Sequence, residues 1–257
     1  MLGAIAGDMM GARFERFPTK RTDFTLIPST ATFTDDTILT VAIADAILTN
    51  MDYDVALKEY ARKYYYLPYG RAFKRWSRTW DSIPYGSCGN GSAMRVSPVG
   101  FAFDEGVEVL YQAKKSAEVT HNHPEGIKGA QAVALAIHFA RRGLSKETIR
   151  DEISGLFEYN LRRTITEIRP GYKYNTTCQG SVPESIIAFL DSNSYEEAIV
   201  NAISLGGDAD TMACIAGGIA EAFYGGVPEK IKAKVVESLD KDLMCVVDDL
   251  YATSLRI

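Results

Sequence analysis

Apolar residues recur at helical spacing along most of this chain, and this pattern limits the possible folds more than any other feature. Residues 36–49 and residues 125–142 each place isoleucine, valine and alanine side chains on one face of a helix. The alternation that a β-strand needs is confined to residues 23–34, where Pro28 interrupts it. The sequence therefore predicts an all-α fold, with about ten or more helices of ordinary length.

Helix boundary signals divide the rest of the chain. Pro124 and Gly143 bracket the helix over 125–142, and Ser194 with Glu197 has the spacing of a capping box. Further helices are predicted over residues 145–161, 194–206, 228–239 and 243–255. Because no low-complexity linker or charged block separates these segments, we expect a single domain over residues 1–257.

Glycines in two of the apolar segments predict close helix packing. Gly3, Gly7 and Gly11 are four residues apart and share one helical face, and Gly217 and Gly218 lie inside a second small-residue segment. A glycine inside a helix costs about 1 kcal/mol relative to alanine. We therefore expect these glycines to allow a close approach of another backbone.

The charge balance disfavours some classes of partner. The chain has 28 basic and 33 acidic residues, a formal charge of −5, which is unlike the basic footprint of a nucleic-acid or anionic-membrane surface. No stretch reaches the roughly 20 apolar residues of a membrane helix, and Asp8 interrupts the first apolar segment, so we expect neither a membrane span nor a signal peptide. The four cysteines are widely spaced, which favours a reduced, cytoplasmic protein.

Two acidic clusters precede apolar helices at distant points in the sequence. The first is Thr34, Asp35 and Asp36, and the second is Asp208, Asp210 and Thr211. One aspartate satisfies a helix N-terminus, and helix capping remains an alternative for either cluster alone. A second aspartate adds like-charge repulsion unless a cation offsets it. The repeated pattern therefore favours a site for Mg²⁺, Mn²⁺ or Ca²⁺, and four aspartates could hold two such ions.

A glycine-rich loop and a histidine pair are further candidates for ligand contacts. The loop contains Ser87, Cys88, Gly89, Asn90 and Gly91, and it lacks both the Walker and the dinucleotide-binding patterns. Closely spaced glycines let backbone N–H groups approach an anion or a sugar, although an ordinary loop remains the alternative. His121 and His123 precede the helix over 125–142, and either a capping role or a ligand contact fits them.

Taken in order, these stretches resemble the ADP-ribosylglycohydrolases, a family that includes the dinitrogenase-reductase-activating glycohydrolases and the ADP-ribosylhydrolases. The likeness runs through "GAIAGDMMGARFE", "FTDDTIL", "GNGSAMRVSPVG", "THNHPEGIKGAQAVALAIH", "CQGSVPESIIAFLDS" and "SLGGDADTMACIAGGIAEAFYG". The resemblance implies an orthogonal multi-helix bundle with a binuclear Mg²⁺ or Mn²⁺ centre at the mouth of a cleft.

The resemblance also assigns roles to individual residues. It implies metal ligands at Thr34, Asp35, Asp36, Asp208, Asp210 and Thr211. It implies ligand contacts at Ser87, Cys88, Gly89, Asn90, Gly91 and His121, and a mobile acid near the metals at Glu15. Two features depart from the family pattern, because Cys88 stands where relatives often have an aromatic ring and the loop has no carboxylate at 86–89. The second departure makes Glu15 a better candidate for proton transfer than a loop acid.

The expected activity is metal-dependent hydrolysis of the bond between ADP-ribose and an acceptor, which releases ADP-ribose. Glu15 or Asp36 is expected to orient or deprotonate the attacking water. The expected acceptor is a protein side chain, a nucleobase or a small molecule, and nucleic acid is expected only as a modified acceptor. Two alternatives stay open: a non-catalytic ADP-ribose-binding or structural member of the family, and a metal phosphohydrolase. The aromatic and basic segment over residues 64–80 is interpreted as helix packing in preference to a partner contact.

Overall fold

The computed structural model describes residues 1–254, and the regular elements in that range are all helices, which confirms the predicted all-α class. Before residue 120, α4, α5 and α6 are short, with six, four and six residues. The bounds are α1 Leu2–Arg16, α2 Asp35–Thr49, α3 Tyr53–Lys63, α4 Arg71–Trp76, α5 Gly91–Met94, α6 Ser97–Ala102, α7 Gly106–Glu118, α8 Pro124–Arg141, α9 Lys146–Phe157, α10 Ile165–Ile168, α11 Cys178–Leu190, α12 Tyr195–Ser204, α13 Ala209–Tyr224, α14 Glu229–Ser238 and α15 Lys241–Ser254.

The expected helices are present with adjusted ends. The prediction over 145–161 is four residues too long, because Glu158 adopts a left-handed conformation and ends α9 at Phe157. The last helix begins at Lys241, two residues earlier than predicted, and Leu255 of the predicted span lies outside the described residues. Residues 23–34 form no strand and belong to the irregular connection between α1 and α2.

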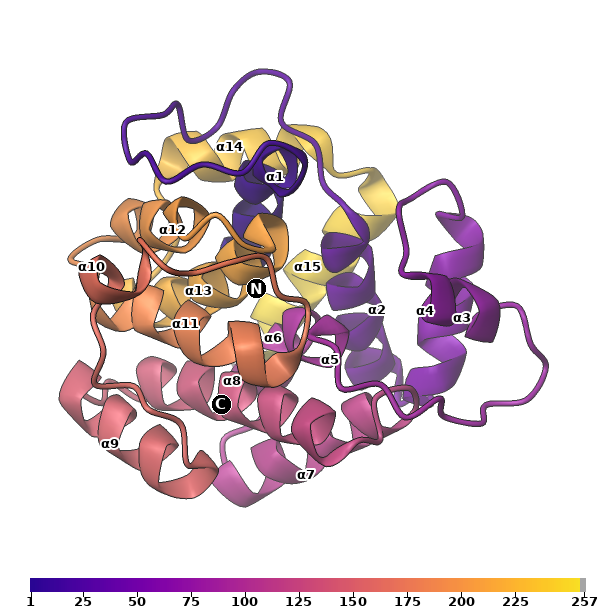
Figure 1. Ribbon diagram of the computed structural model, residues 1–257. Helices are drawn as coiled ribbons and strands as arrows, with labels where there is room; N and C mark the ends of the chain where they lie inside the picture. Colours follow the sequence, from indigo (N-terminus) through magenta and orange to yellow (C-terminus); the bar gives the residue numbers. More distant parts are fainter. Residues whose placement is uncertain (255–257) are drawn as a thin grey trace.

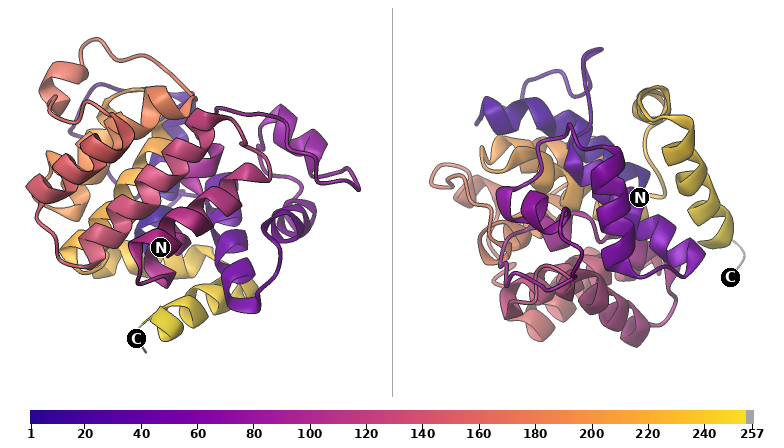
Figure 2. Two further views of the ribbon diagram at one scale, coloured as in Figure 1. Left: turned by 90° about the horizontal axis from the view of Figure 1, so that it is seen from below. Right: turned by 90° about the vertical axis from the view of Figure 1, so that its right-hand side faces the viewer.

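Helix α13 occupies the centre of the bundle (Figure 1). Its residues from Ala209 to Glu221 are buried, and α1, α8, α11 and α12 surround it. Helices α3 and α4 lie at one edge of the molecule, away from this centre (Figures 1 and 2). None of the helices within residues 1–254 combines the length and the apolar character that crossing a bilayer requires.

The predicted close approach of glycines occurs between α1 and α13. A Cβ atom added to Gly3 would lie 2.4 Å from the carbonyl oxygen of Gly217, and one added to Gly7 would lie 2.1 Å from that of Ala213. A Cβ atom on Gly11 would lie 2.3 Å from the carbonyl oxygen of Ala209. Since real Cβ atoms do not approach this closely, only glycine allows the two backbones to touch along this face.

This contact has a direct consequence for the acidic residues. The pairs of positions run in opposite directions, so the C-terminal end of α1 lies beside the N-terminal end of α13. Glu15 stands one helical turn beyond Gly11, and Asp208 and Asp210 flank Ala209. The glycine face therefore brings an acid from the first helix to the acids that open the central helix.

Candidate active site

A cleft of about 370 Å³ opens where the two acidic clusters meet. Its walls contain most of the site residues predicted from the sequence, namely Glu15, Asp35, Asp36, Ser87, Gly89, Asn90, Gly91, His121, Asp208, Asp210 and Thr211. Thr34 and Cys88 are the two predicted residues outside this lining. The structure thus brings together segments that lie more than 190 residues apart in the sequence.

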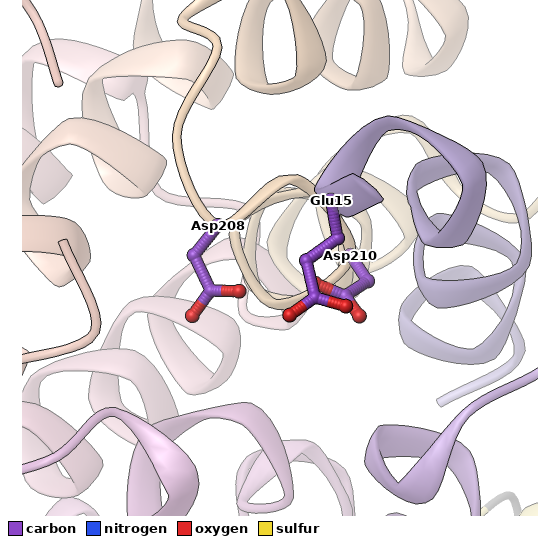
Figure 3. Close-up of side chains that lie close together, drawn as sticks. All are labelled: Glu15, Asp208 and Asp210. Atoms are coloured by element: carbon purple, nitrogen blue, oxygen red, sulfur yellow. The ribbon is translucent and has the colours of Figure 1, made fainter. Parts of the chain in front are cut away.

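Three carboxylates form the tightest group in the cleft. Ligand oxygens of Glu15, Asp208 and Asp210 all lie within 4.8 Å of one another. Figure 3 shows the three side chains extending in a common direction from the end of α1 and the start of α13. Glu15 is exposed, whereas the two aspartates are buried. The hydroxyl of Tyr174 donates a hydrogen bond of 3.2 Å to Glu15.

Asp35 and Asp36 add negative charge from the N-terminus of α2. Burial, the charge of Asp8 and, to a lesser extent, those of Glu15 and Asp208 raise the pKa of Asp35 to about 7. Burial and the charge of Asp210 raise the pKa of Asp36 well above its usual value. Such shifts mean that the fold concentrates like charges without neutralising them.

No basic side chain among the described residues offsets these charges by direct pairing. Among residues 1–254, no lysine or arginine forms an ion pair with any carboxylate of the two clusters or with Glu15. In the same range Asp36 Oδ2 is buried without a hydrogen-bond partner. A buried carboxylate oxygen without a partner is costly. This orphaned oxygen and the carboxylates around it fit a hard divalent cation.

The two threonines of the clusters differ in their surroundings. The Thr34 hydroxyl donates to Asp8 Oδ1 at 2.8 Å and accepts from the backbone N–H of Asp36 at 3.2 Å, which makes it the N-cap of α2. The Thr211 hydroxyl lies 3.9 Å from the sulfur of Met94. Thr211 therefore has a freer oxygen on the cleft wall than Thr34, whose hydroxyl is already used twice.

The glycine loop forms the facing wall and is tied to the acids. The Asn90 amide donates to Asp208 Oδ2 at 2.7 Å. The backbone N–H of Asn90 donates to Thr176 O, and the backbone N–H of Cys178 donates to Cys88 O, both at 2.8 Å. These two bonds make an isolated bridge that fixes the loop against the start of α11. Cys88 contributes its carbonyl oxygen to this bridge and lies outside the cleft lining.

His121 closes the back of the loop. A Cβ atom on Gly91 would lie 3.1 Å from His121 Nε2, so the glycine leaves the ring just enough room. The other ring nitrogen lies 2.8 Å from the hydroxyl of Thr120. Burial, and then the charge of Arg95, lower the pKa of His121 well below its usual value, so the ring is neutral at pH 7. His123, in contrast, accepts a hydrogen bond from the N–H of Glu125 and caps α8.

A sequence model of the family described as ADP-ribosylglycohydrolase matches residues 1–256. The chain belongs to the ADP-ribosylglycohydrolase family. It is therefore an enzyme of the glycohydrolase type, as the order of its motifs predicts.

Individual relatives of this ADP-ribosylglycohydrolase support the assignment. The chain is 28% identical to ADP-ribosylhydrolase ARH3 of Gallus gallus, over 88% of this chain and 84% of that protein. It is 25% identical to ADP-ribosylarginine hydrolase Tri1 of Pseudomonas putida, over 93% of this chain and 73% of that protein. A solved structure described as an ADP-ribosylglycohydrolase-related protein complex superposes with a TM-score of 0.75 at 26% identity, covering 98% of this chain and 97% of that one.

Sequence reasoning missed two buried charges that shape this ADP-ribosylglycohydrolase cleft. Asp8 is fully buried and holds the start of α2 through Thr34 and Thr37, both of whose backbone N–H and hydroxyl groups donate to it. Arg95 is also fully buried; its Nη2 donates to Ser116 O and Thr120 Oγ1, while Nε and Nη1 have no partner within residues 1–254. A lone acid inside an apolar helix was the available signal for Asp8, and Arg95 had no such signal.

Proposed function

We propose that this enzyme hydrolyses the glycosidic bond between ADP-ribose and an acceptor, with divalent cations, Mg²⁺ or Mn²⁺, bound by the acids of the cleft. The observation that carries the proposal is the convergence of Glu15, Asp208 and Asp210 within 4.8 Å beside the orphaned Asp36 Oδ2. Carboxylate oxygens at this density need positive charge, and the cleft of about 370 Å³ leaves room for cations and a sugar.

The candidate cation ligands are the six residues implied by the family resemblance. They are Thr34, Asp35, Asp36, Asp208, Asp210 and Thr211, and four aspartates suit two ions. Bound cations would supply the positive charge that holds the hydroxyls of the ribose at the scissile bond. Asp8 holds the backbone on either side of Asp35 and Asp36, because it accepts hydrogen bonds from the N–H groups of Thr34 and Thr37.

The glycine loop is proposed to hold the remainder of ADP-ribose. Gly89 and Gly91 let the loop backbone approach a ligand, and Ser87 adds a hydroxyl. The backbone hydrogen bond from Cys178 N–H to Cys88 O keeps the loop in place. The positive charge of Arg95 lies behind this wall. Burial lowers the pKa of Arg95 to about 10, which leaves the guanidinium charged at pH 7. A fixed charge there favours the diphosphate. The neutral His121 ring offers Nε2 to the ligand side of the loop.

Glu15 is the proposed proton acceptor. Water attacks the anomeric carbon as the bond to the leaving group breaks, through a transition state with oxocarbenium character. Glu15 takes one proton from this water, and the leaving group is released with a proton in its place. Glu15 is the exposed member of the carboxylate group, so it meets solvent, and Tyr174 steadies its side chain. Asp36 is buried beside other acids and is better suited to binding a cation.

The direct test is release of free ADP-ribose from ADP-ribosylated proteins carrying arginine or serine linkages. We expect release with Mg²⁺ or Mn²⁺ and none after EDTA treatment. Glu15→Gln should lower turnover by a factor of about 100 or more, the usual contribution of a general base. Asp36→Asn and Asp210→Asn should abolish metal uptake in a calorimetric titration. Glu152→Gln, an exposed change on α9, serves as the matched control.

The same assays separate the alternatives. Tight ADP-ribose binding without any release from either linkage would mark a non-catalytic binding protein. Phosphate release from a nucleotide panel would instead mark a phosphohydrolase. The three histidines of the chain make that outcome unexpected, because such sites usually recruit several histidines beside aspartate. We keep the cytoplasm as the expected location, since all four cysteines are free thiols.

A further inference from the structure

The segment from Lys58 to Trp80 concentrates basic and aromatic residues beside the cleft. It contains seven basic residues and one acidic residue in a chain whose net charge is −5, and it holds both tryptophans. It covers the end of α3, the whole of α4 and the turns that follow, at the edge of the molecule (Figures 1 and 2). The local charge is therefore opposite to that of the whole protein.

Four cations of this segment share one side of α4. Their spacing is i, i+3, i+4 and i+7, and a hydrogen bond of 2.8 Å from Ser77 N–H to Phe73 O continues the turn beyond the end of the helix. Phe73 and Trp76 point the other way and are buried. We call the four residues the basic face: Arg71, Lys74, Arg75 and Arg78.

The basic face has no internal counter-charge. Within residues 1–254, none of its four side chains forms an ion pair or a hydrogen bond. Seven residues of helical rise span only about 10 Å, so four like charges repel one another at short range. Uncompensated charge of this density favours an anionic partner.

The basic face begins at the cleft and continues away from it. Arg71 lines the cleft itself. Lys74 and Arg78 line a separate hollow of about 150 Å³, together with Arg62 and Tyr65. An extended anion that enters the cleft at one end would therefore meet positive charge along its length.

Exposed aromatic rings accompany the cations. Tyr65, Tyr66 and Trp80 are 68%, 65% and 98% exposed. Phe73 and Trp76 of the same segment pack inward. The backbone on either side of Trp80 is held in place, because the Lys58 ammonium donates to the carbonyls of Thr79 and Asp81. Lys58 also lies 4.7 Å from the centre of the Trp76 ring.

We propose that the basic face, with Tyr65 and Trp80, docks a single-stranded nucleic acid that carries the ADP-ribosyl group. The phosphates pair with the four cations, and unstacked bases lie on the exposed rings of Tyr65 and Trp80. This proposal rests on the proposed function and specifies its acceptor. The net acidity of the chain argued against nucleic acid in general, but the docking surface is a local reversal next to the cleft.

An acidic peptide is the competing partner, and the aromatic rings decide against it. Carboxylates would satisfy the cations equally well, but a peptide rich in Asp and Glu offers no aromatic ring to stack on Tyr65 and Trp80. Every nucleobase has such a face, and stacking on an aromatic ring contributes about 1–3 kcal/mol per base. Rings exposed beside unpaired cations match a nucleic-acid strand.

Binding can be measured without any ADP-ribosyl group. Fluorescence anisotropy with a labelled oligothymidylate and a labelled polyglutamate of equal charge compares the two partners. We expect the oligothymidylate to bind more tightly. Lys74→Gln/Arg75→Gln/Arg78→Gln should reduce the slope of log K against log salt by about 2, since each phosphate contact on a single strand contributes about 0.7. Trp80→Ala should weaken binding about tenfold.

The matched control removes three exposed lysines elsewhere: Lys230→Gln/Lys232→Gln/Lys241→Gln. Its affinity for oligothymidylate should equal that of the wild type, and thermal unfolding verifies that both triple variants are folded. Equal loss in the two triple variants would overturn the proposal, as would tighter binding of polyglutamate.

Turnover separates this inference from the proposed function. ADP-ribose release is compared for an ADP-ribosylated oligonucleotide and a short, neutral ADP-ribosylated peptide. We expect a higher kcat/KM for the oligonucleotide, and the α4 triple variant should lower the ratio of the two values. Release from the peptide alone would overturn the nucleic-acid acceptor and leave the hydrolase intact. Release from neither would refute the proposed function, whatever the anisotropy shows.

Discussion

Both oxygens of the Asp8 carboxylate accept hydrogen bonds from Thr34, one from its backbone N–H at 2.9 Å and the other from its hydroxyl at 2.8 Å. Asp8 lies in the middle of α1, and Thr34 caps α2. Through this pair the first helix fixes the start of the second, just as its glycines fix the start of α13. Helix α1 is therefore the part of the chain that sets both acidic clusters.

Asp8→Ala should destabilise the protein and weaken metal binding together. It leaves buried donors of Thr34 and Thr37 without an acceptor, and each such loss costs about 1–3 kcal/mol. Urea unfolding and Mg²⁺ calorimetry measure the two effects. Asp45→Ala is the control, because within residues 1–254 the Asp45 carboxylate accepts a hydrogen bond from Tyr60 and from no residue of the cleft. A variant that lost stability but bound Mg²⁺ normally would separate Asp8 from the metal site.

Gly7→Ala should be among the most damaging single-methyl additions. Its Cβ atom would lie 2.1 Å from the carbonyl oxygen of Ala213, so α1 and α13 must separate. We expect a loss of about 1–3 kcal/mol in the free energy of unfolding. The matched change is Gly155→Ala in α9, where the new methyl meets no atom within 4 Å. It should stabilise by about 0.4–1 kcal/mol, so equal effects of the two changes would contradict the packing argument.

The metal-free protein should lose stability as the pH rises from about 4 to about 7. Burial and neighbouring acids raise the pKa of Asp35 to about 7, from a usual value of 3.8. Across this window the folded state holds a proton on Asp35 that the unfolded state has released, so the free energy of unfolding falls with increasing pH, and the contribution of Asp35 levels off above about pH 7. Urea unfolding in EDTA measures the effect, and saturating Mg²⁺ should flatten or reverse it.

Neutralising a cluster should stabilise the metal-free protein. Asp35→Asn/Asp36→Asn removes the charges whose repulsion and burial raise the pKa of both groups. At pH 8 in EDTA this variant should unfold at a higher temperature than the wild type, whereas with Mg²⁺ the order should reverse. A double variant that is less stable in both conditions would mean that the aspartates serve the fold and not a cation.

Asn90→Leu should lower the affinity for ADP-ribose more than it lowers stability. The amide of Asn90 donates to Asp208 and to Ser181, and so joins the glycine loop to the acidic wall. Calorimetric titration with ADP-ribose and Mg²⁺ measures the affinity. Asn193→Leu, at the remote turn before α12, is the control and should leave the titration unchanged. Unaltered affinity in Asn90→Leu would dismiss the link between the two walls.

The sequence predicted the fold class from local helical patterns. It predicted the meeting of the two acidic clusters from their repeated aspartate pattern and from the family resemblance. Glycine is costly inside a helix, so Gly3, Gly7 and Gly11 signalled a backbone contact before their partner was known. The four aspartates predicted a cation-binding site, because neighbouring carboxylates repel one another unless a cation offsets their charge. In both cases an unfavourable local choice pointed to a tertiary compensation.

The remaining parts depend on contacts between distant segments. The partners of Asp8 lie 26 and 29 residues away, and no local rule connects them. The interpretation of residues 64–80 as helix packing describes Phe73 and Trp76, which pack inward. It does not describe Arg71, which lines the cleft. The side on which a short helix such as α4 is covered depends on how the flanking loops run, and propensity does not encode that path.

The direct backbone contact between α1 and α13, called here the seam, separates positions that protein engineering can vary from positions that it cannot. No side chain in that seam can be trimmed or enlarged to adjust the spacing of Glu15 from Asp208 and Asp210. Libraries aimed at new acceptors should therefore leave the seam untouched and diversify the rim of the cleft. Grafting a foreign rim onto this helix pair becomes a practical route to enzymes that remove ADP-ribose from chosen targets.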